Sequence, residues 1–127
     1  MDIITHQKID ASLCGHPIKL EDGFSRVSFV PQENMVVDET GLVHGGFIFG
    51  LADYAAMISV NHPNVVLGSA DVKFLKPVKA GESLIAESVV QGSEGKKRIA
   101  TVTVRSDDTK IFEGVFTCFV LEKHVLA

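Results

Sequence analysis

The chain has 127 residues, of which 46% are hydrophobic and 22% charged, and its formal net charge is −4. This length fits one domain with its own core and is too short for two. The composition is ordinary for a globular protein. The negative charge argues against general nucleic-acid binding, because domains that bind nucleic acids are usually basic.

The two cysteines and five histidines do not form a recognisable framework. Cys14 and Cys118 lack the density of secreted disulfide proteins, and no histidine or cysteine spacing matches a metal site. The start of the chain lacks the basic and apolar segments of a signal peptide. Glycines and an aspartate interrupt the longest apolar run, which argues against a transmembrane span. The expected location is cytoplasmic.

The N-terminal part predicts a short helix followed by two strands. Ile9 and Leu13 are four residues apart and would share one face of a helix over residues 5–13, with Thr5 as a weak N-cap. Residues 18–31 then alternate apolar and polar side chains around a break at Asp22-Gly23. This pattern predicts two strand segments joined by a turn or bulge. Residues 32–41 are expected to form a loop.

The longest apolar run lies between Gly41 and Val60 and predicts a central helix. This helix should begin near Gly45 and end near Val60, because the proline and asparagines of residues 61–64 are a strong stop. A helix that is apolar nearly all round is normally buried.

Two features of this run are unnecessary in a plain core helix. One is the His44-Gly45-Gly46 entry, and the other is Asp53, which is the only formally charged side chain between residues 39 and 71. A carboxylate in a buried helix needs a partner or a purpose. We therefore expect the functional site on this segment.

Four further strands are predicted after the helix, over residues 65–77, 82–91, 96–105 and 110–121. The short loops between the later strands imply antiparallel neighbours. One long apolar helix followed by antiparallel strands predicts a single α+β domain over residues 1–127, with the sheet curled around the helix.

Three motifs resemble those of the hot-dog-fold acyl-CoA thioesterases of the phenylacetic-acid-pathway type. They are Gly41-x-x-His44-Gly45-Gly46, Leu51-Ala52-Asp53, and the segment from Phe74 to Glu82 with its Pro-x-x-x-Gly-Glu turn. The resemblance covers about residues 17–121. It implies a curved sheet wrapped on one helix, a homodimer or dimer of dimers, and hydrolysis of thioesters of coenzyme A without a metal or organic cofactor.

The residue types agree with this chemistry. Thioester hydrolysis needs a donor for the developing oxyanion, and either a base for water or a carboxylate nucleophile. Gly45 and Gly46 open a helix, where backbone N–H groups lack internal partners and glycine allows a close approach of substrate. Gly45 N–H is the expected oxyanion donor and Asp53 the base or nucleophile, with Gly46 and Phe47 beside the substrate. His44 is either a catalytic group or a structural cap of the loop.

The spacing of these groups predicts a dimer. Gly45 and Asp53 are eight residues apart, or roughly 12 Å along one helix. A base and an oxyanion donor must both lie about 3 Å from the same reacting group. One chain cannot supply both, whereas two antiparallel helices related by a two-fold axis can.

The sequence departs from the family in two places. Asp38 stands six residues before His44, where many relatives carry an asparagine that helps to orient the site, and an acid there could repel a phosphate-rich ligand. Relatives often present a serine or threonine on the strand after the helix. The aligned region here reads Leu67-Gly68-Ser69, so that role is empty or falls to Ser69. Asp38 and Ser69 are included among the expected substrate-binding residues.

Alternative interpretations stay open for several residues. The glycine pair could reflect close packing, Asp53 could be a hydrogen-bonded interface carboxylate, and Phe47 could belong to the core. Lys97 and Arg98 either form a solvated hairpin or contact the phosphates of coenzyme A.

At the level of function, the main alternative to a thioesterase is a non-catalytic acyl-CoA-binding domain with a regulatory role. A dehydratase on the same fold is disfavoured, because the residue fourteen positions after His44 is Ile58 and not an acid.

Overall fold

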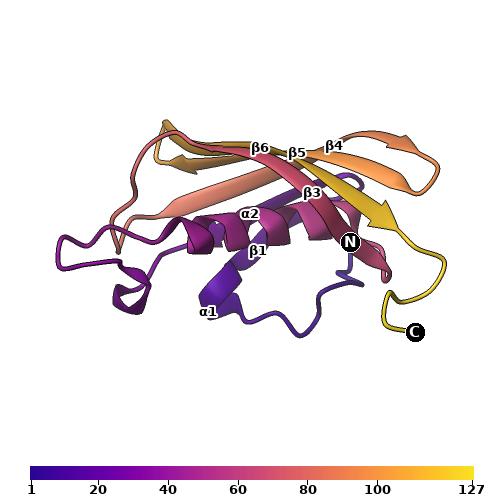
Figure 1. Cartoon of the computed structure of the whole chain (residues 1–127), viewed down its shortest axis with the longest axis horizontal. Coiled ribbons are helices and arrows are strands. Elements are labelled where there is room, and N and C mark those ends of the chain that lie inside the picture. The colour runs from indigo at the N-terminus through magenta and orange to yellow at the C-terminus, as the bar shows by residue number, and fades with distance from the viewer.

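The computed structural model describes residues 1–127 and is built around one helix that lies on the concave face of a single antiparallel sheet (Figure 1). The order of strands in the sheet is β1-β2-β4-β5-β6-β3. The elements in chain order are α1 (Ala11–Cys14), β1 (His16–Glu21), β2 (Phe24–Phe29), the 3-10 turn η1 (Glu33–Met35), α2 (Gly45–Val60), β3 (Val65–Phe74), β4 (Leu84–Glu94), β5 (Lys97–Ser106) and β6 (Thr109–Val120).

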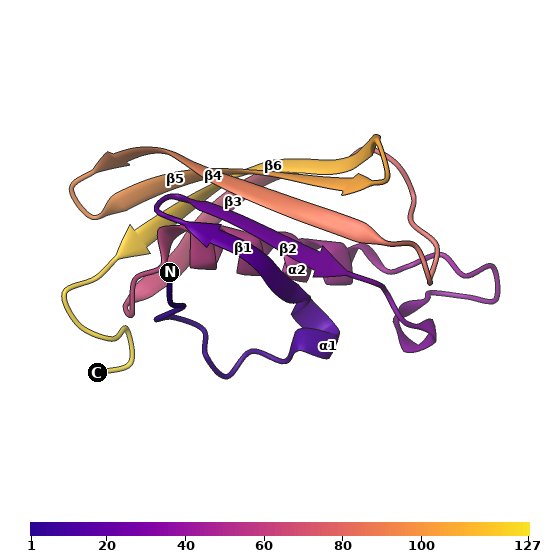
Figure 2. The same cartoon turned by 180° about the vertical axis from the view of Figure 1, so that it is seen from behind.

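The central helix α2 begins and ends where the sequence predicts. His44 is its N-cap, and its C-cap Asn61 takes the left-handed conformation, with φ 52°, while donating its backbone N–H to Met57 O. The Asn61 side chain also holds the start of the chain, because Oδ1 accepts from Ile4 N at 2.9 Å and Nδ2 donates to Asp2 O at 2.8 Å. The N-terminal segment therefore runs beside the far end of α2 (Figure 2).

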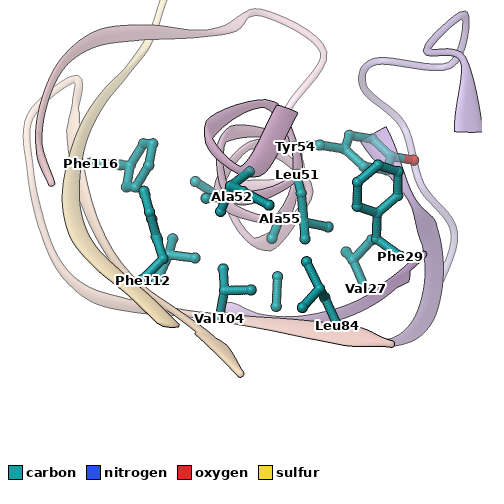
Figure 3. Packing of buried hydrophobic residues seen from close by; sticks show 14 of the residues in the cluster. Val27, Phe29, Leu51, Ala52, Tyr54, Ala55, Leu84, Val104, Phe112 and Phe116 are labelled. Carbon is teal, nitrogen blue, oxygen red and sulfur yellow. The ribbon is translucent and has the colours of Figure 1, made fainter. Parts of the chain in front are cut away.

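The core lies between α2 and the curled sheet, as Figure 3 shows. Small side chains on α2, such as Ala52 and Ala55, are fully buried and let the helix approach the strands closely. Larger side chains fill the space on both sides, among them Phe112 and Phe116 from β6. Burying each such large apolar side chain contributes about 1.5–3 kcal/mol, so this cluster is the main source of stability.

Three buried serines join the second half of α2 to the sheet. Ser25 Oγ on β2 donates to Ala55 O at 2.6 Å, and Ser59 Oγ on α2 lies 2.8 Å from Ser88 Oγ on β4. Ser25 and Ser88 are themselves cross-strand partners. Buried hydroxyls with partners specify one arrangement of the surrounding core, so these contacts fix how α2 is seated on β2 and β4.

The prediction of a helix over residues 5–13 is wrong, because helix α1 covers only Ala11–Cys14. Asp10 starts this helix by accepting from Ser12 N, so it is Asp10 and not Thr5 that acts as the N-cap. His6 takes a left-handed conformation with φ 51°, which interrupts any earlier helix. Thr5 is buried, and its hydroxyl lies 2.8 Å from His6 Nδ1.

The other elements occur as predicted, with shifted ends. The β1–β2 hairpin turns at Asp22-Gly23, where Gly23 has φ 76°. Strand β3 stops at Phe74, and the next two backbone N–H groups both donate to Ile111 O. Strand β4 continues to Glu94 because a register shift leaves Gln91 without a partner on β5 and pairing resumes at Gly92 with Ile99. The expected loop over residues 32–41 contains the short turn η1 and an isolated β-bridge from Val36 to Val43.

Candidate active site

The N-terminus of α2 presents one uncommitted backbone donor. His44 Nδ1 accepts from Gly46 N at 2.8 Å, and His44 O accepts from Phe47 N at 3.1 Å. Gly45 N–H makes no hydrogen bond within the chain. The first N–H groups of a helix carry partial positive charge, so Gly45 N–H is suited to an oxyanion.

His44 has a defined tautomer in this arrangement. Because Nδ1 accepts a hydrogen bond, a neutral His44 ring carries its proton on Nε2. The ring is exposed and packs edge-on to Phe47, with centroids 6.1 Å apart. His44 is thus the cap of the helix, and it has a free Nε2–H donor at the same end as Gly45.

An apolar groove of about 260 Å³ opens beside Gly45. A Cβ built on Gly45 would lie 3.1 Å from Phe74 Cε1, so the Phe74 ring sits directly over the glycine. The groove is lined by Leu42, Val43, Gly45, Ile48, Phe74, Leu75, Lys76, Pro77, Val78 and Ile111. A second hollow of about 340 Å³, between α1 and strands β2 and β4, has no carboxylate in its lining.

Asp53 lies two turns further along α2 and has no counterion. Its Oδ1 atom is buried without any hydrogen-bond partner, and the carboxylate forms no ion pair. Burial raises the pKa of Asp53 to about 6, because the charged form is poorly solvated there. Such a carboxylate is basic enough to accept a proton from water near neutral pH.

The two thiols near this carboxylate are unsuited to nucleophilic attack. Burial raises the pKa of the Cys118 thiol to about 12, and burial first and the charge of Asp53 second raise the pKa of Cys14. The thiolate is the reactive form of cysteine, so both thiols stay protonated at neutral pH. Among the groups here, Asp53 is the better candidate.

Gly45 and Asp53 are not brought together within one chain. They are eight residues apart on a continuous helix, which separates them by about 12 Å along its axis. Asp53 does not line the groove beside Gly45. Each chain therefore carries two incomplete halves of the expected site.

The remaining predicted substrate residues are scattered. Asp38 lies in an exposed turn, where its carboxylate accepts from Thr40 N at 2.9 Å, and the Thr40 side-chain and backbone hydrogen bonds lower the pKa of Asp38. Ser69 is exposed on β3, immediately after a break in the register with β6. Phe47 is half-buried beside His44. Gly46 is exposed, with its N–H bonded to His44.

Lys97 and Arg98 lie at the β4–β5 hairpin. Arg98 Nη1 donates to Gly95 O and Lys97 O, so it braces its own turn. Lys97 is in register with Phe119 and, through β6, with Val66 at the start of β3. That is the end of the sheet near the C-terminus of α2 (Figure 1), away from Gly45 of the same chain.

Sequence reasoning missed Phe74 and the groove that it covers. The Phe74–Pro77 segment belongs to one of the motifs that resemble the family, but nothing in its alternation shows that the ring lies over Gly45. No three His, Cys, Asp or Glu side chains converge as a group able to hold a metal ion. No helix is long and apolar enough to cross a membrane.

An antiparallel sheet wrapped around one long helix, with a glycine entry at the helix N-terminus, defines this domain as a hot-dog fold. The chain belongs to the thioesterase superfamily, whose family model matches residues 40–112.

Three similar proteins cover nearly the whole chain. A methylthioribose-1-phosphate isomerase from Aquifex aeolicus is 50% identical over 123 residues, which are 96% of this chain and 27% of that protein. Transcription factor FapR from Caldanaerobacter subterraneus is 32% identical over 119 residues, or 93% of this chain and 60% of FapR. The crystal structure of the uncharacterized protein PH1136 from Pyrococcus horikoshii has a TM-score of 0.98 at 49% identity, covering 100% and 98% of the two chains.

More distant structures share the fold. A mutant of the phenylacetic acid degradation protein PaaI from Thermus thermophilus has a TM-score of 0.79 at 25% identity, covering 86% and 95% of the chains. The structure of smu.793 from Streptococcus mutans, bound to acetyl CoA, has a TM-score of 0.82 at 21% identity, covering 93% and 97%. The resemblance to the phenylacetic-acid-pathway type is therefore distant, whereas membership of the superfamily is established. The chain spans about a quarter of the isomerase and three fifths of FapR.

Proposed function

We propose that this protein is an acyl-CoA thioesterase that hydrolyses a small or medium acyl-CoA, aromatic acyl groups included. The observation that carries the proposal is the pair of uncommitted groups on α2: the Asp53 carboxylate with its unpartnered Oδ1 and the free Gly45 N–H. Membership of the thioesterase superfamily supports the reaction class. The acetyl CoA bound to smu.793 supports coenzyme A as the carrier.

The mechanism follows from what these groups can do. Asp53 takes a proton from a water molecule as the water oxygen bonds to the thioester carbonyl carbon. Gly45 N–H donates to the oxyanion that develops on the carbonyl oxygen, and His44 Nε2–H is a second donor at the same end. The C–S bond then breaks, the thiolate leaves with the electron pair, and the Asp53 carboxyl returns the proton. Direct attack by Asp53 through an anhydride is the other route open to a carboxylate.

The site requires a homodimer in which Gly45 of one protomer faces Asp53 of its partner. Strand β3 lies at the edge of the sheet with ten residues unpaired on one side and contains no proline. The opposite edge, β1, is shorter and carries Pro17 and a register shift, features that discourage pairing. Pairing of β3 with β3 of a second copy would align the two helices antiparallel, and two such dimers would form a dimer of dimers.

The same two-fold axis would carry Lys97 and Arg98 toward the Gly45 end of the partner, because these residues are aligned with the start of β3. There they would be placed to contact the phosphates of coenzyme A. Within one chain they have no such role.

A second candidate function is acyl-CoA binding without turnover, in a regulatory role. The 32% identity with the transcription factor FapR favours it, as does Asp38 at a position where the family commonly has asparagine. Release of free thiol from a panel of acyl-CoAs, with Asp53→Ala as control, separates the two functions. Binding of acyl-CoA with no thiol release would leave only the second.

The shared site is tested by complementation. Gly45→Pro removes the N–H at the first helical position, where proline is well accepted, and His44 already has the extended conformation that precedes proline, with φ −63° and ψ 131°. Gly45→Ala adds the same Cβ beneath Phe74 but keeps the N–H, so it is the matched control.

Mixing inactive Gly45→Pro with inactive Asp53→Asn under subunit exchange gives about half heterodimers, each with one intact site. Activity should therefore return to roughly a quarter of that of the wild type, as expected for two isologous sites. No recovery, with exchange verified, would contradict the shared site.

A further inference from the structure

We propose that the groove beside Gly45 holds the acyl group of the thioester, that it selects an uncharged acyl group, and that Phe74 sets the length accepted. This inference rests on the proposed function, because it takes Gly45 N–H to be the group that binds the thioester carbonyl. Phe74 is then a specificity-determining residue and takes no part in the bond-breaking steps.

The position of the groove follows from the fold. Its floor is made of side chains that belong to the core, Ile48 from α2 and Ile111 from β6, each only 3% exposed. Its walls are Leu42 and Leu75, which remain 37% and 43% exposed. A rigid apolar floor with exposed apolar walls is typical of a small-molecule site.

Phe74 controls the width of the groove at Gly45. Its ring packs edge-on against the fully buried Phe112, with centroids 5.1 Å apart, so one side of the ring is anchored in the core. The ring nevertheless remains 55% exposed and lies over Gly45. Because Gly45 and Phe74 line the same groove, a thioester whose carbonyl binds Gly45 N–H would place its acyl group beside this ring.

The charge of the lining indicates the class of acyl group. Nine of the ten lining residues are uncharged, and the tenth, Lys76, is exposed at the surface. No arginine and no buried polar side chain is present to receive a carboxylate at the end of the acyl chain. Because an unpaired charge is costly to bury, the groove favours a hydrocarbon chain or a ring.

The test measures binding separately from turnover. Asp53→Asn protein is titrated calorimetrically with coenzyme A, with straight-chain acyl-CoAs from acetyl to dodecanoyl, and with an acyl-CoA that ends in a carboxylate. Affinity should rise about fourfold per methylene until the groove is full. The carboxylate-terminated ligand should bind at least about tenfold more weakly than its methyl-terminated counterpart.

Substitutions on two different walls move the optimum in opposite directions. Adding Phe74→Ala to the Asp53→Asn protein should extend the optimum to longer chains, and adding Leu42→Trp should shorten it. Val115→Ala is the matched control, because Val115 is an exposed apolar residue of β6 outside the groove. Leu42 lies in the loop before α2 and not on β3, so it probes the groove even if Phe74→Ala disturbs pairing of β3. Light scattering reports the oligomeric state of every variant.

The outcomes separate the two proposals. A chain-length profile that is flat, or that neither substitution shifts, overturns the assignment of the groove. An equal change for coenzyme A and for every acyl-CoA in the Phe74→Ala protein also overturns it. Chain-length-dependent binding by a wild-type protein that releases no thiol supports the groove and removes the proposed hydrolysis.

Discussion

The two halves of α2 differ in how completely they are buried and in how their polar groups are bonded. From Tyr54 to Ser59 every side chain is buried, and hydrogen bonds from buried serines join the helix to β2 and β4. From Gly45 to Asp53 three residues are glycine, the first N–H is free, and one carboxylate has an oxygen without a partner. The second half is buried all round, whereas the first half buries only some of its residues, such as Leu51, and presents polar groups that form no bond within the chain.

This difference shows how a short domain can keep reactive groups in place. An unpartnered carboxylate and a glycine-rich first turn both cost stability. They persist because the next two turns are packed on all sides and tied to the sheet. The candidate chemistry and the tightest packing therefore occupy successive turns of the same helix, and substitutions in the second half should change stability with little effect on the rate of hydrolysis.

The largest expected effect is a loss of hydrolysis rate when Asp53, in the first half of α2, is substituted. Asp53→Asn should lower kcat/KM for acyl-CoA hydrolysis by about three orders of magnitude, because a general base is removed. Asp107→Asn is the control, since Asp107 is an exposed turn residue with φ 51°, a conformation that asparagine accepts. A similar loss in both variants, or none in Asp53→Asn, would contradict the role of Asp53.

The next largest expected effect is a loss of folding stability when Ser59, in the second half of α2, is substituted. Ser59→Ala leaves the fully buried Ser88 hydroxyl without its partner and should lower the free energy of unfolding by about 1–3 kcal/mol. The double variant Ser59→Ala/Ser88→Ala should recover part of this loss, because no orphaned hydroxyl remains. Denaturant unfolding measures the cycle, while kcat should stay within about twofold of the wild type. A large drop in kcat at unchanged stability would contradict the prediction that the second half of α2 contributes to stability and not to catalysis.

The third effect is a pH dependence of stability that arises from Asp53 in the first half of α2. The folded pKa of Asp53, about 6, lies above the ordinary value of 3.8, so between these values the folded chain binds more protons than the unfolded chain. The Asp53 contribution to stability is thus fully present below pH 3.8 and is lost as pH rises through about 6. The wild type should lose about 1–2 kcal/mol relative to Asp53→Asn over this window. Rate and stability should move in opposite directions, since hydrolysis needs the ionised form.

Paired thermal melts of wild type and Asp53→Asn at pH 4 and pH 8 check this linkage. The melting temperatures should nearly coincide at the lower pH, and Asp53→Asn should be the more stable at the higher one. A constant difference at both values would mean that Asp53 does not titrate in this range.

The smallest effect comes from Gly50 in the first half. A Cβ at Gly50 would meet nothing within 4 Å, so Gly50→Ala should raise the free energy of unfolding by about 0.5–1 kcal/mol through helix propensity alone. Gly114→Ala on β6 is the contrast, because its Cβ would lie 2.7 Å from Val72 Cγ1 and should destabilise the fold. A destabilised Gly50→Ala protein would show that another chain covers this face of α2.

The sequence predicts correctly those elements whose ends are marked by nearby glycine, proline or asparagine residues. Both ends of α2 follow from Gly45 and from Asn61 with the proline after it, and the hairpin turn follows from Asp22-Gly23. The N-terminal helix failed because Asp10, and not Thr5, provides the cap. Spacing of Ile9 and Leu13 alone does not reveal that choice, since local hydrogen bonds compete with helix propensity.

For the candidate site, the sequence identifies the candidate reactive groups but not the side chains that surround them. Gly45 and Asp53 stood out because glycine and a carboxylate are anomalous in a buried helix. The bond from Gly46 N to His44, which leaves Gly45 N–H as the free donor, depends on a side-chain rotamer that no pattern encodes. The Phe74 ring meets Gly45 only through the order of strands in the sheet, and that order is a property of the whole fold.

Asn61 couples the beginning of the chain to the end of the central helix. Its side-chain amide hydrogen-bonds the backbone of residues 2 and 4, while its left-handed backbone conformation ends α2. Any peptide joined ahead of Met1, such as a purification tag, would therefore leave the domain beside the last turn of α2. Asn61→Gly would keep the left-handed conformation that ends the helix but would remove both side-chain hydrogen bonds. It would therefore release the first residues of the chain from α2 without extending the helix.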